Sequence, residues 1–299
     1  MRCLCIGICQ TDAVATILKQ IPEFTKIYDD ILVYTVFAIS IDEMKNILET
    51  VVPTCDLIIS QPVSENYRDT DLFSSSKLRS SLKSNAKHLI FSNCYFTGYD
   101  PCPFQLTNKN HEIIHIDNIS YIPSLCLESL LNKQIEQACI DWCNPESYSD
   151  SELFKNYNLS ITQLKTREDK IFNNDFGVDI KISDFIEQNY KSQHLFHTYN
   201  HPTNILLIEL ANRILSNINI QGTIPDIKKE LLGTMSIPPP LSLYLKYKMS
   251  FTYPFFIINN QPYTTQETMT ILSETLSKAD HTLFNQFRST VKYARSLIS

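Results

Sequence analysis

Short apolar runs alternate with amphipathic segments through the first third of the chain. Residues 12–21 and 40–52 repeat their apolar positions at helical spacing, and Ser40 begins the second segment as a candidate N-cap. The apolar runs between such segments are typical of buried strands and lie at 3–8, 30–37, 55–61 and 88–93, with 111–116 as a further candidate. Strands that alternate with helices in this way predict a mostly parallel sheet flanked by helices.

After about residue 120 the pattern becomes mainly helical. One aromatic run, 249–258, is typical of a strand, and the stretch 220–245 predicts a loop with a short helix. Helical spacing recurs at 122–142, 150–172, 181–190, 204–218, 264–277 and 280–297. No repeat or low-complexity linker divides the chain. We therefore expect one α/β domain over residues 1–299, with a sheet-rich part (1–120) and a large helical C-terminal part (121–299) packed on it.

Composition excludes several classes of protein. The 299 residues include only 5 glycines, and no glycine-rich phosphate loop occurs. A net charge of −6 does not indicate the basic surface that binds nucleic acid. No apolar run approaches the ~20 residues that span a membrane. The N-terminus lacks a signal peptide pattern.

The nine cysteines are best explained as reduced and mostly buried thiols of a cytoplasmic protein. The chain contains no C-x-x-C and no H-E-x-x-H motif, and no other cysteine or histidine spacing matches a structural zinc site. We therefore expect no metal.

Polar residues gather where apolar runs end, in four short segments. These are 7–10 (GICQ), 60–69 (SQPVSENYRD), 92–101 (SNCYFTGYDP) and 197–204 (HTYNHPTN). The first three directly follow predicted strands. Because ligands of open α/β sheets bind beyond the carboxyl ends of the strands, these three segments predict a site at one rim of the sheet.

Cys9 is the candidate nucleophile at this rim. It lies where a strand turns into a helix, and unpaired backbone N–H groups at a helix start lower the pKa of a thiol. Gln10, Ser60 and Asn93 could donate hydrogen bonds to an oxyanion from neighbouring strand ends. The alternative is that Cys9 is a small buried residue closing the strand, and that Ser60 and Asn93 are turn residues.

His201 is the candidate general base. Pro202 suits the first position of the helix that follows, which makes His201 its N-cap, and a helix N-terminus keeps an imidazole neutral. His197, four residues earlier, is the rival. The alternative is a capping or loop histidine. In segment 60–69, Tyr67 could stack on an adenine ring, and Arg68 could bind a phosphate through its planar guanidinium or stay a solvated surface residue.

The four segments together resemble the WcbI-type family of polysaccharide-biosynthesis acyltransferases. The resemblance rests on the turn Gly7–Gln10, the blocks 60–68 and 92–100, and the turn Asn200–Thr203, and it covers most of residues 3–215. Ile8 stands where the family commonly has a small polar residue. A fainter similarity links the chain to SGNH-type esterases, although Thr198 replaces the aspartate three residues before the late histidine.

The resemblance implies a cytoplasmic enzyme that takes coenzyme A or acetyl-CoA as substrate and acylates a sugar of a surface or capsular polysaccharide. Cys9 and His201 would match the family's cysteine and late histidine. Arg68 and Lys77 would hold the CoA phosphates, and Asn200 could orient the ring of His201. Cys9 would either carry the acyl group as a thioester or only line the pocket while His201 activates the acceptor.

Two other functions remain open from the sequence. A cysteine-dependent SGNH-like esterase would transfer the acyl group to water and would need no CoA. A non-catalytic binding protein of polysaccharide assembly would keep its function without Cys9 and His201.

Overall fold

The computed structural model describes residues 1–110, 112–172 and 176–298. Its contacts divide the chain into two compact units, each assembled from three separate segments. The first unit comprises Met1–Cys94, Gln163–Ile186 and Pro202–Leu232, and the second comprises Tyr95–Thr162, Glu187–His201 and Gly233–Ser299. These segments do not follow the expected boundary near residue 120, and a single domain over 1–299 stays a prediction.

A four-stranded parallel sheet forms the centre of the first unit, as the sequence pattern predicts. Its order is β2-β1-β3-β4, and every neighbouring pair is parallel. The strands are β1 (Arg2–Gly7), β2 (Asp30–Thr35), β3 (Leu57–Ser60) and β4 (Lys87–Ile90). The α/β class is therefore confirmed, and the carboxyl ends of β1, β3 and β4 lie side by side.

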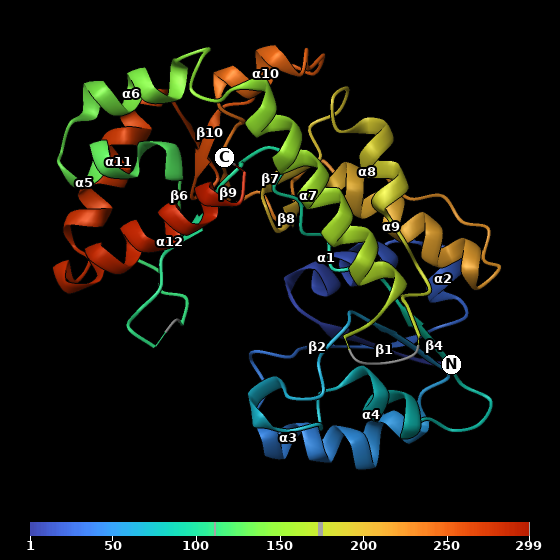
Figure 1. Cartoon of the computed structure of the whole chain (residues 1–299). Coiled ribbons are helices and arrows are strands. Elements are labelled where there is room, and N and C mark those ends of the chain that lie inside the picture. The colour runs from blue at the N-terminus through green and yellow to red at the C-terminus, as the bar shows by residue number, and fades with distance from the viewer. Residues whose placement is uncertain (111, 173–175, 299) are drawn as a thin grey trace. The chain divides into compact units, whose positions relative to one another are not determined.

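Helices cover both faces of this sheet (Figure 1). Leu4 and Ile6 of β1 pack with Met44 and Leu78, which places α3 and α4 on one face. The alternate residues Cys3 and Cys5 are fully buried on the opposite face, where α1 and α9 contact each other. The helices of this unit are α1 (Cys9–Leu18), α2 (Pro22–Thr25), α3 (Ile41–Asn46), α4 (Ser75–Ser80) and α9 (Asn204–Asn217).

The start of α3 follows from its sequence. The Ser40 hydroxyl accepts the backbone N–H of Glu43, and the Glu43 carboxylate accepts the N–H of Ser40, which is a complete capping box. The helix continues through a π-helical turn (Ile47–Val51) and a 3₁₀ turn (Val52–Thr54), so the predicted N-cap and helix are confirmed.

A distant segment protects the edge of β4. Asp179 accepts the N–H of Ile90 at 2.8 Å, and the N–H of Ile180 donates to the Ile90 carbonyl at 3.0 Å. Phe91 and Ile180 form a parallel bridge. The exposed hydrogen-bonding edge of the sheet is thereby paired.

The second unit has its own hydrophobic core. Trp142 and Phe287 are almost completely buried in it, with aliphatic residues from surrounding helices and from the antiparallel sheet β11-β10-β9. Its helices are α5 (Leu127–Leu131), α6 (Ile135–Cys143), α10 (Leu241–Lys246), α11 (Thr265–Ser277) and α12 (Phe284–Ser296). Its strands are β5 (Phe104–Gln105), β6 (Tyr121–Ile122), β9 (Met235–Ser236), β10 (Phe256–Ile258) and β11 (Gln261–Tyr263).

Two predicted elements of this unit are wrong in extent. The helix expected over 122–142 is interrupted between α5 and α6, because Lys133 adopts a left-handed conformation with φ 57°. The aromatic run 249–258 is a strand only from Phe256 onward. The candidate strand 111–116 includes His111, which lies outside the described residues; from Glu112 onward it forms isolated bridges only.

Helices α7 (Asp150–Asp169) and α8 (Ser183–Asn189) run across the segment boundaries between the units and match their predicted positions. Within the described ranges, no helix has both the length and the apolar character that crossing a bilayer would require.

Candidate functional site

Cys9 is the first residue of α1 and directly follows the strand β1 and Ile8. Ile8 is the N-cap of the helix but contributes no side-chain cap, so the first turn leaves backbone N–H groups available. The N–H groups of Cys9 and Gln10 interact with the Cys9 sulfur and favour its thiolate. The placement of Cys9 at the junction of strand and helix is therefore as predicted.

The predicted direction of the Cys9 pKa is wrong. Burial raises the pKa of this thiol above its usual value, and the two N–H groups offset only part of that rise. Desolvation of the thiolate outweighs the helix N-terminus because the side chain sits among packed residues. Cys9 is nevertheless the only cysteine of the first unit that is not fully buried; Cys3, Cys5, Cys55 and Cys94 are.

The amide of Gln61 connects three strand ends to the start of α1. Its Nε2 donates to Gln10 Oε1 at 2.9 Å and to Asn93 Oδ1 at 2.7 Å. Its Oε1 accepts the Ile8 N–H at 3.1 Å and the Thr11 hydroxyl at 2.9 Å. Gln61 is 1% exposed, so these four bonds use the whole hydrogen-bonding capacity of a buried amide.

Gln10 and Asn93 extend this network. Gln10 is fully buried, accepts the Cys94 N–H at 3.0 Å and donates to the Cys94 carbonyl at 3.0 Å. Asn93 donates to the Pro62 carbonyl at 3.3 Å. In the ligand-free protein both side chains therefore hold the rim of the sheet together, and their role as oxyanion donors stays a prediction.

Gly7 fits the close packing at the end of β1. A Cβ atom at this position would lie 2.1 Å from Thr11 Oγ1 and 3.1 Å from Gln61 Oε1. Any side chain would therefore push Thr11 and Gln61 apart and disturb the turn that carries Cys9.

The hydroxyl of Ser60 forms a hydrogen bond to a residue of the neighbouring strand. Its Oγ lies 2.8 Å from His88 Nε2, and Ser60 is fully buried. Burial, with a smaller effect of the nearby Arg79, lowers the pKa of His88 to about 3, so this ring is neutral at pH 7. The hydroxyl of Ser60 is thus engaged with a histidine rather than pointing at open space, and its oxyanion role also stays a prediction.

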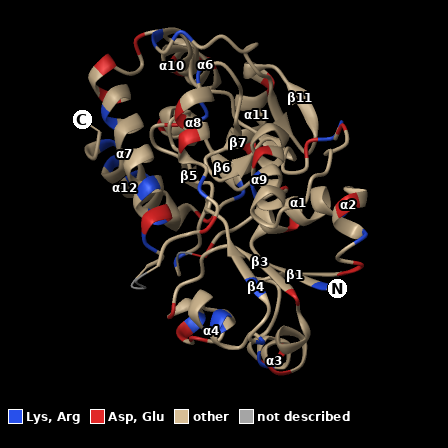
Figure 2. Ribbon diagram, turned by 90° about the vertical axis from the view of Figure 1, so that its right-hand side faces the viewer, with Lys and Arg blue, Asp and Glu red and all other residues tan. Residues whose placement is uncertain are grey.

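Tyr67 and Arg68 both lie against the ring of Phe73. The Tyr67 ring meets Phe73 edge-on at 5.5 Å, and the Arg68 guanidinium lies 5.5 Å from the centre of the same ring. Arg68 also donates to the Ile39 carbonyl at 2.6 Å. Lys77 belongs to the first turn of α4, whose basic residues are visible in Figure 2. The structure therefore brings Tyr67 and Arg68 together, and a ligand site shared with Lys77 stays a prediction.

The backbone of Arg68 and Asp69 is unusual. Both residues are left-handed, with φ 58° and 57°. Such conformations are uncommon for residues with side chains and are frequent where a loop meets a ligand.

The predicted N-cap role of His201 is wrong. Helix α9 begins at Asn204 with Thr203 as its N-cap, and His201 lies before it in the short strand β8 (His201–Pro202). The Asn204 N–H donates to the Glu230 carboxylate at 2.8 Å. A carboxylate from elsewhere in the chain thus stabilises the helix N-terminus.

His201 is nevertheless neutral, for a different reason. Burial, with a smaller effect of His197, lowers its pKa to about 4. The ring meets Tyr121 edge-on at 5.6 Å, and Nδ1 has no hydrogen-bond partner among the described residues. Asn200 accepts hydrogen bonds from the hydroxyls of Tyr121 at 2.9 Å and Thr198 at 3.0 Å, which fixes the turn before His201.

The rival His197 is more enclosed. It is 7% exposed, lies in β7 (Phe196–Thr198), and accepts the N–H of Ile237 on its backbone carbonyl at 2.8 Å. The cavity beside it measures about 10 Å³, room for a single water. Cys9 belongs to the first unit and His201 to the second, so their action as a nucleophile and base stays a prediction.

Gln61 was not selected from the sequence, although it lies in one of the four segments. The signal was an amide directly after an apolar strand and before a proline, a position that favours a buried hydrogen-bonded side chain. Within residues 1–110, 112–172 and 176–298, no group of three His, Cys, Asp or Glu side chains is placed to hold a metal ion.

Comparisons with known proteins agree with this architecture. The family model described as polysaccharide biosynthesis enzyme WcbI matches residues 2–223. A solved structure of WcbI, described as a novel polysaccharide biosynthesis enzyme, superposes with a TM-score of 0.79 at 20% identity, over 99% of this chain and 98% of that chain. That structure is of the native protein without a disulfide bond between coenzyme A and one of its cysteines. None of the curated proteins compared with the chain matches it.

Replacing Gln61 with Leu should destabilise the first unit. The change removes the acceptor of the Ile8 N–H and one hydrogen bond each from Gln10, Asn93 and Thr11, so we expect the free energy of unfolding to fall by about 2–4 kcal/mol. Urea denaturation measures this. Gln20→Leu is the matched control, because Gln20 is exposed, and it should change stability by about 0.5 kcal/mol or less. A loss below about 1 kcal/mol for Gln61→Leu would contradict the role given to this amide.

The reactivity of Cys9 should depend steeply on pH. Because its pKa is raised, only a small fraction is thiolate at pH 7, and alkylation by iodoacetamide should accelerate about tenfold per pH unit from pH 7 to 9. Peptide mass spectrometry of the intact, folded chain reports the rate at Cys9 alone. An alkylation rate that does not increase above pH 7 would mean that the N–H groups of Cys9 and Gln10 lower the pKa of Cys9 more than burial raises it.

Proposed function

Because the chain belongs to the WcbI family of polysaccharide biosynthesis enzymes, we propose that it transfers an acyl group, such as acetyl, from coenzyme A to a sugar hydroxyl. The observation that supports this most is a partly exposed cysteine at a helix start, beyond the carboxyl end of a central parallel strand. The proposed donor is acyl-CoA and the proposed acceptor is a sugar of a surface or capsular polysaccharide. Because acyl-CoA is a cytoplasmic substrate, the proposal includes a cytoplasmic reaction.

Cys9 is the cysteine best suited to meet the thiol end of coenzyme A. Six of the nine cysteines are buried, and the two others with exposure, Cys139 and Cys143, lie on α6 in the second unit. The solved WcbI structure is described as the native protein without a disulfide bond between coenzyme A and a cysteine, and this mention of the two sulfurs together supports a cysteine near the thiol end of coenzyme A. In this chain we assign that position to Cys9.

The covalent route balances in two steps. The Cys9 thiolate attacks the thioester carbonyl, a new C–S bond forms, and the CoA thiolate leaves. A sugar hydroxyl then attacks the acyl-Cys9 carbonyl, its proton passes to a base, and the Cys9 thiolate leaves. Thioester exchange is close to thermoneutral, so the first step costs little. The N–H groups of Cys9 and Gln10 lie close to the sulfur and suit the oxyanion that forms in each step.

His201 is the proposed base. Its ring is neutral at pH 7 and can accept the proton of the sugar hydroxyl. With a pKa of about 4 His201 is a weak base, and a substrate that brings negative charge to the site would raise this pKa. In the direct route His201 activates the sugar hydroxyl, which attacks acyl-CoA without an acyl-Cys9 stage.

The CoA phosphates would bind beside Phe73. Arg68 is exposed, and Lys77 lies in the first turn of α4. The planar guanidinium suits a phosphate, and Tyr67 offers a half-buried ring for adenine. The left-handed turn at Arg68 presents this side chain at the surface.

Coenzyme A should bind the reduced protein with micromolar affinity, and Arg68→Ala should weaken binding about tenfold, because a charged hydrogen bond to phosphate is lost. Isothermal titration measures both. Lys45→Ala is the matched control: Lys45 is an exposed lysine of the same unit, on α3, and forms an ion pair with Asp42. No heat at millimolar CoA, with the protein shown to be folded, would refute the transferase and leave the esterase or the binding protein.

Incubation with acetyl-CoA and no acceptor should add one acetyl group to the Cys9 peptide, and Cys9→Ala should abolish the label. Mass spectrometry measures it, and Cys143→Ala, which changes an exposed cysteine of the second unit, should keep the label. An unlabelled Cys9 in a protein that still releases CoA when a sugar is present would replace the covalent route with the direct one. His201→Ala should then lower that release about 10²–10⁴-fold.

A further inference from the structure

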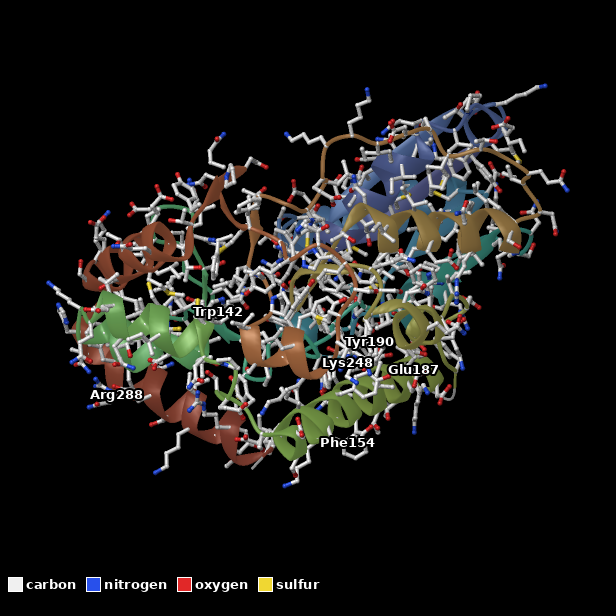
Figure 3. The ribbon with its side chains drawn as sticks, turned by 90° about the horizontal axis from the view of Figure 1, so that it is seen from above. Trp142, Phe154, Glu187, Tyr190, Lys248 and Arg288 are labelled. Carbon is white, nitrogen blue, oxygen red and sulfur yellow. The ribbon has the colours of Figure 1, made fainter. Side chains whose placement is uncertain are left out.

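A large groove in the second unit lies outside every residue assigned above. It measures about 510 Å³ and runs between the stretch 124–129, which includes most of α5, and one side of α12. Arg288, labelled in Figure 3, belongs to α12 and forms an ion pair with Glu128 of α5. A volume of this size is typical of small-molecule sites.

The groove carries an excess of positive charge although the chain as a whole is acidic. Its wall holds the cations Arg288, Lys292 and Arg295 and the carboxylates Glu128 and Asp141. Arg288 is already paired with Glu128, with Nε 2.8 Å from Oε1. Lys292 forms no ion pair within the described part of the chain. Its ammonium group is therefore available to an anion that enters the groove.

The opposite wall holds a buried hydroxyl that protein contacts leave unused. Ser124 is 3% exposed, and its Oγ has no hydrogen-bond partner among residues that the structure describes. Burying a hydroxyl without a partner is costly, so such an atom on a groove wall indicates a ligand or a bound water. Close by, Asp141 accepts one hydrogen bond on each carboxylate oxygen, from Ser129 at 2.7 Å and from Gln137 at 2.8 Å. Each oxygen keeps a second lone pair that can accept a hydroxyl group.

We propose that this groove binds an anionic saccharide, with its phosphate or carboxylate at Lys292 and its hydroxyls at Ser124 and Asp141. Cations at one side and hydroxyl-binding groups at the other match a ligand that carries one acidic group on a polyol. The apolar side chains Leu125, Leu127 and Val291 complete the wall against the sugar's C–H groups. This site is independent of acyl transfer at Cys9, since it uses no residue of the first unit.

The test is isothermal titration of the full chain with four probes: glucose 1-phosphate, glucuronate, inorganic phosphate and glucose. We expect glucose 1-phosphate or glucuronate to bind more tightly than glucose and phosphate by about tenfold or more. The first two probes distinguish a phosphorylated from a carboxylated sugar, and binding of the stronger one should weaken as salt concentration rises.

Substitutions in the groove test whether the sugar binds there. Lys292→Gln should weaken the preferred probe about tenfold or more, and Ser124→Ala about threefold to tenfold. Both should fold normally, because Lys292 is exposed and the Ser124 hydroxyl supports no other group. Lys109→Gln, an exposed lysine of the same unit outside the groove, should bind as the unchanged protein does. Arg68→Ala should also leave the affinity unchanged.

Several results would overturn the proposal. These are no binding of either acidic sugar at 10 mM, equal binding of inorganic phosphate, or an affinity that Lys292→Gln leaves unchanged. Displacement of the sugar by coenzyme A, or its loss in Arg68→Ala, would place the sugar at the acyl-transfer site instead. Because the titration contains no coenzyme A, failure here leaves the acyl-transfer proposal standing, and failure of that proposal leaves this one testable.

Discussion

The site of the first unit depends on one buried amide. Gln61 joins the ends of β1, β3 and β4 through four hydrogen bonds and fixes the backbone where Cys9 begins α1. A buried polar network of this kind is stabilising only when every member has a partner, and here each amide has one at both its oxygen and its nitrogen. The same packing requires Gly7, where a side chain would meet Thr11 and Gln61.

The sheet and its order of elements were predictable because the signals are local. The apolar runs predict strands and the Ser40 capping box predicts a helix start from neighbouring residues alone. The four parallel strands follow from these patterns. The breaks were not predictable. Lys133 interrupts a strongly amphipathic stretch by a left-handed turn, and the N-terminus of α9 is stabilised by Glu230, a residue 26 positions away. Tertiary contacts of that kind leave no trace in the local pattern.

The chemistry of the site was likewise predictable from the sequence only in part. The position of Cys9 at the junction of strand and helix was clear from the sequence, but its protonation was not, because burial raises its pKa against the effect of the helix N-terminus. His201 is neutral as expected, yet through desolvation rather than capping. Gln10 and Asn93 were predicted to donate hydrogen bonds to a substrate. In the structure both side chains accept a hydrogen bond from Gln61. Residue type and position identify reactive groups, whereas burial decides their charge.

The order of the chain also governs how the first unit can be synthesised. The inner face of its sheet, which holds Cys3 and Cys5, is covered by α1 together with α9, and α9 ends at Asn217. The free edge of β4 is paired by Asp179 and Ile180. During translation the edge of β4 therefore stays open until Asp179 and Ile180 are synthesised, and the face that holds Cys3 and Cys5 stays incomplete until α9 ends at Asn217. The sheet can reach its final packing only after this last helix has joined it.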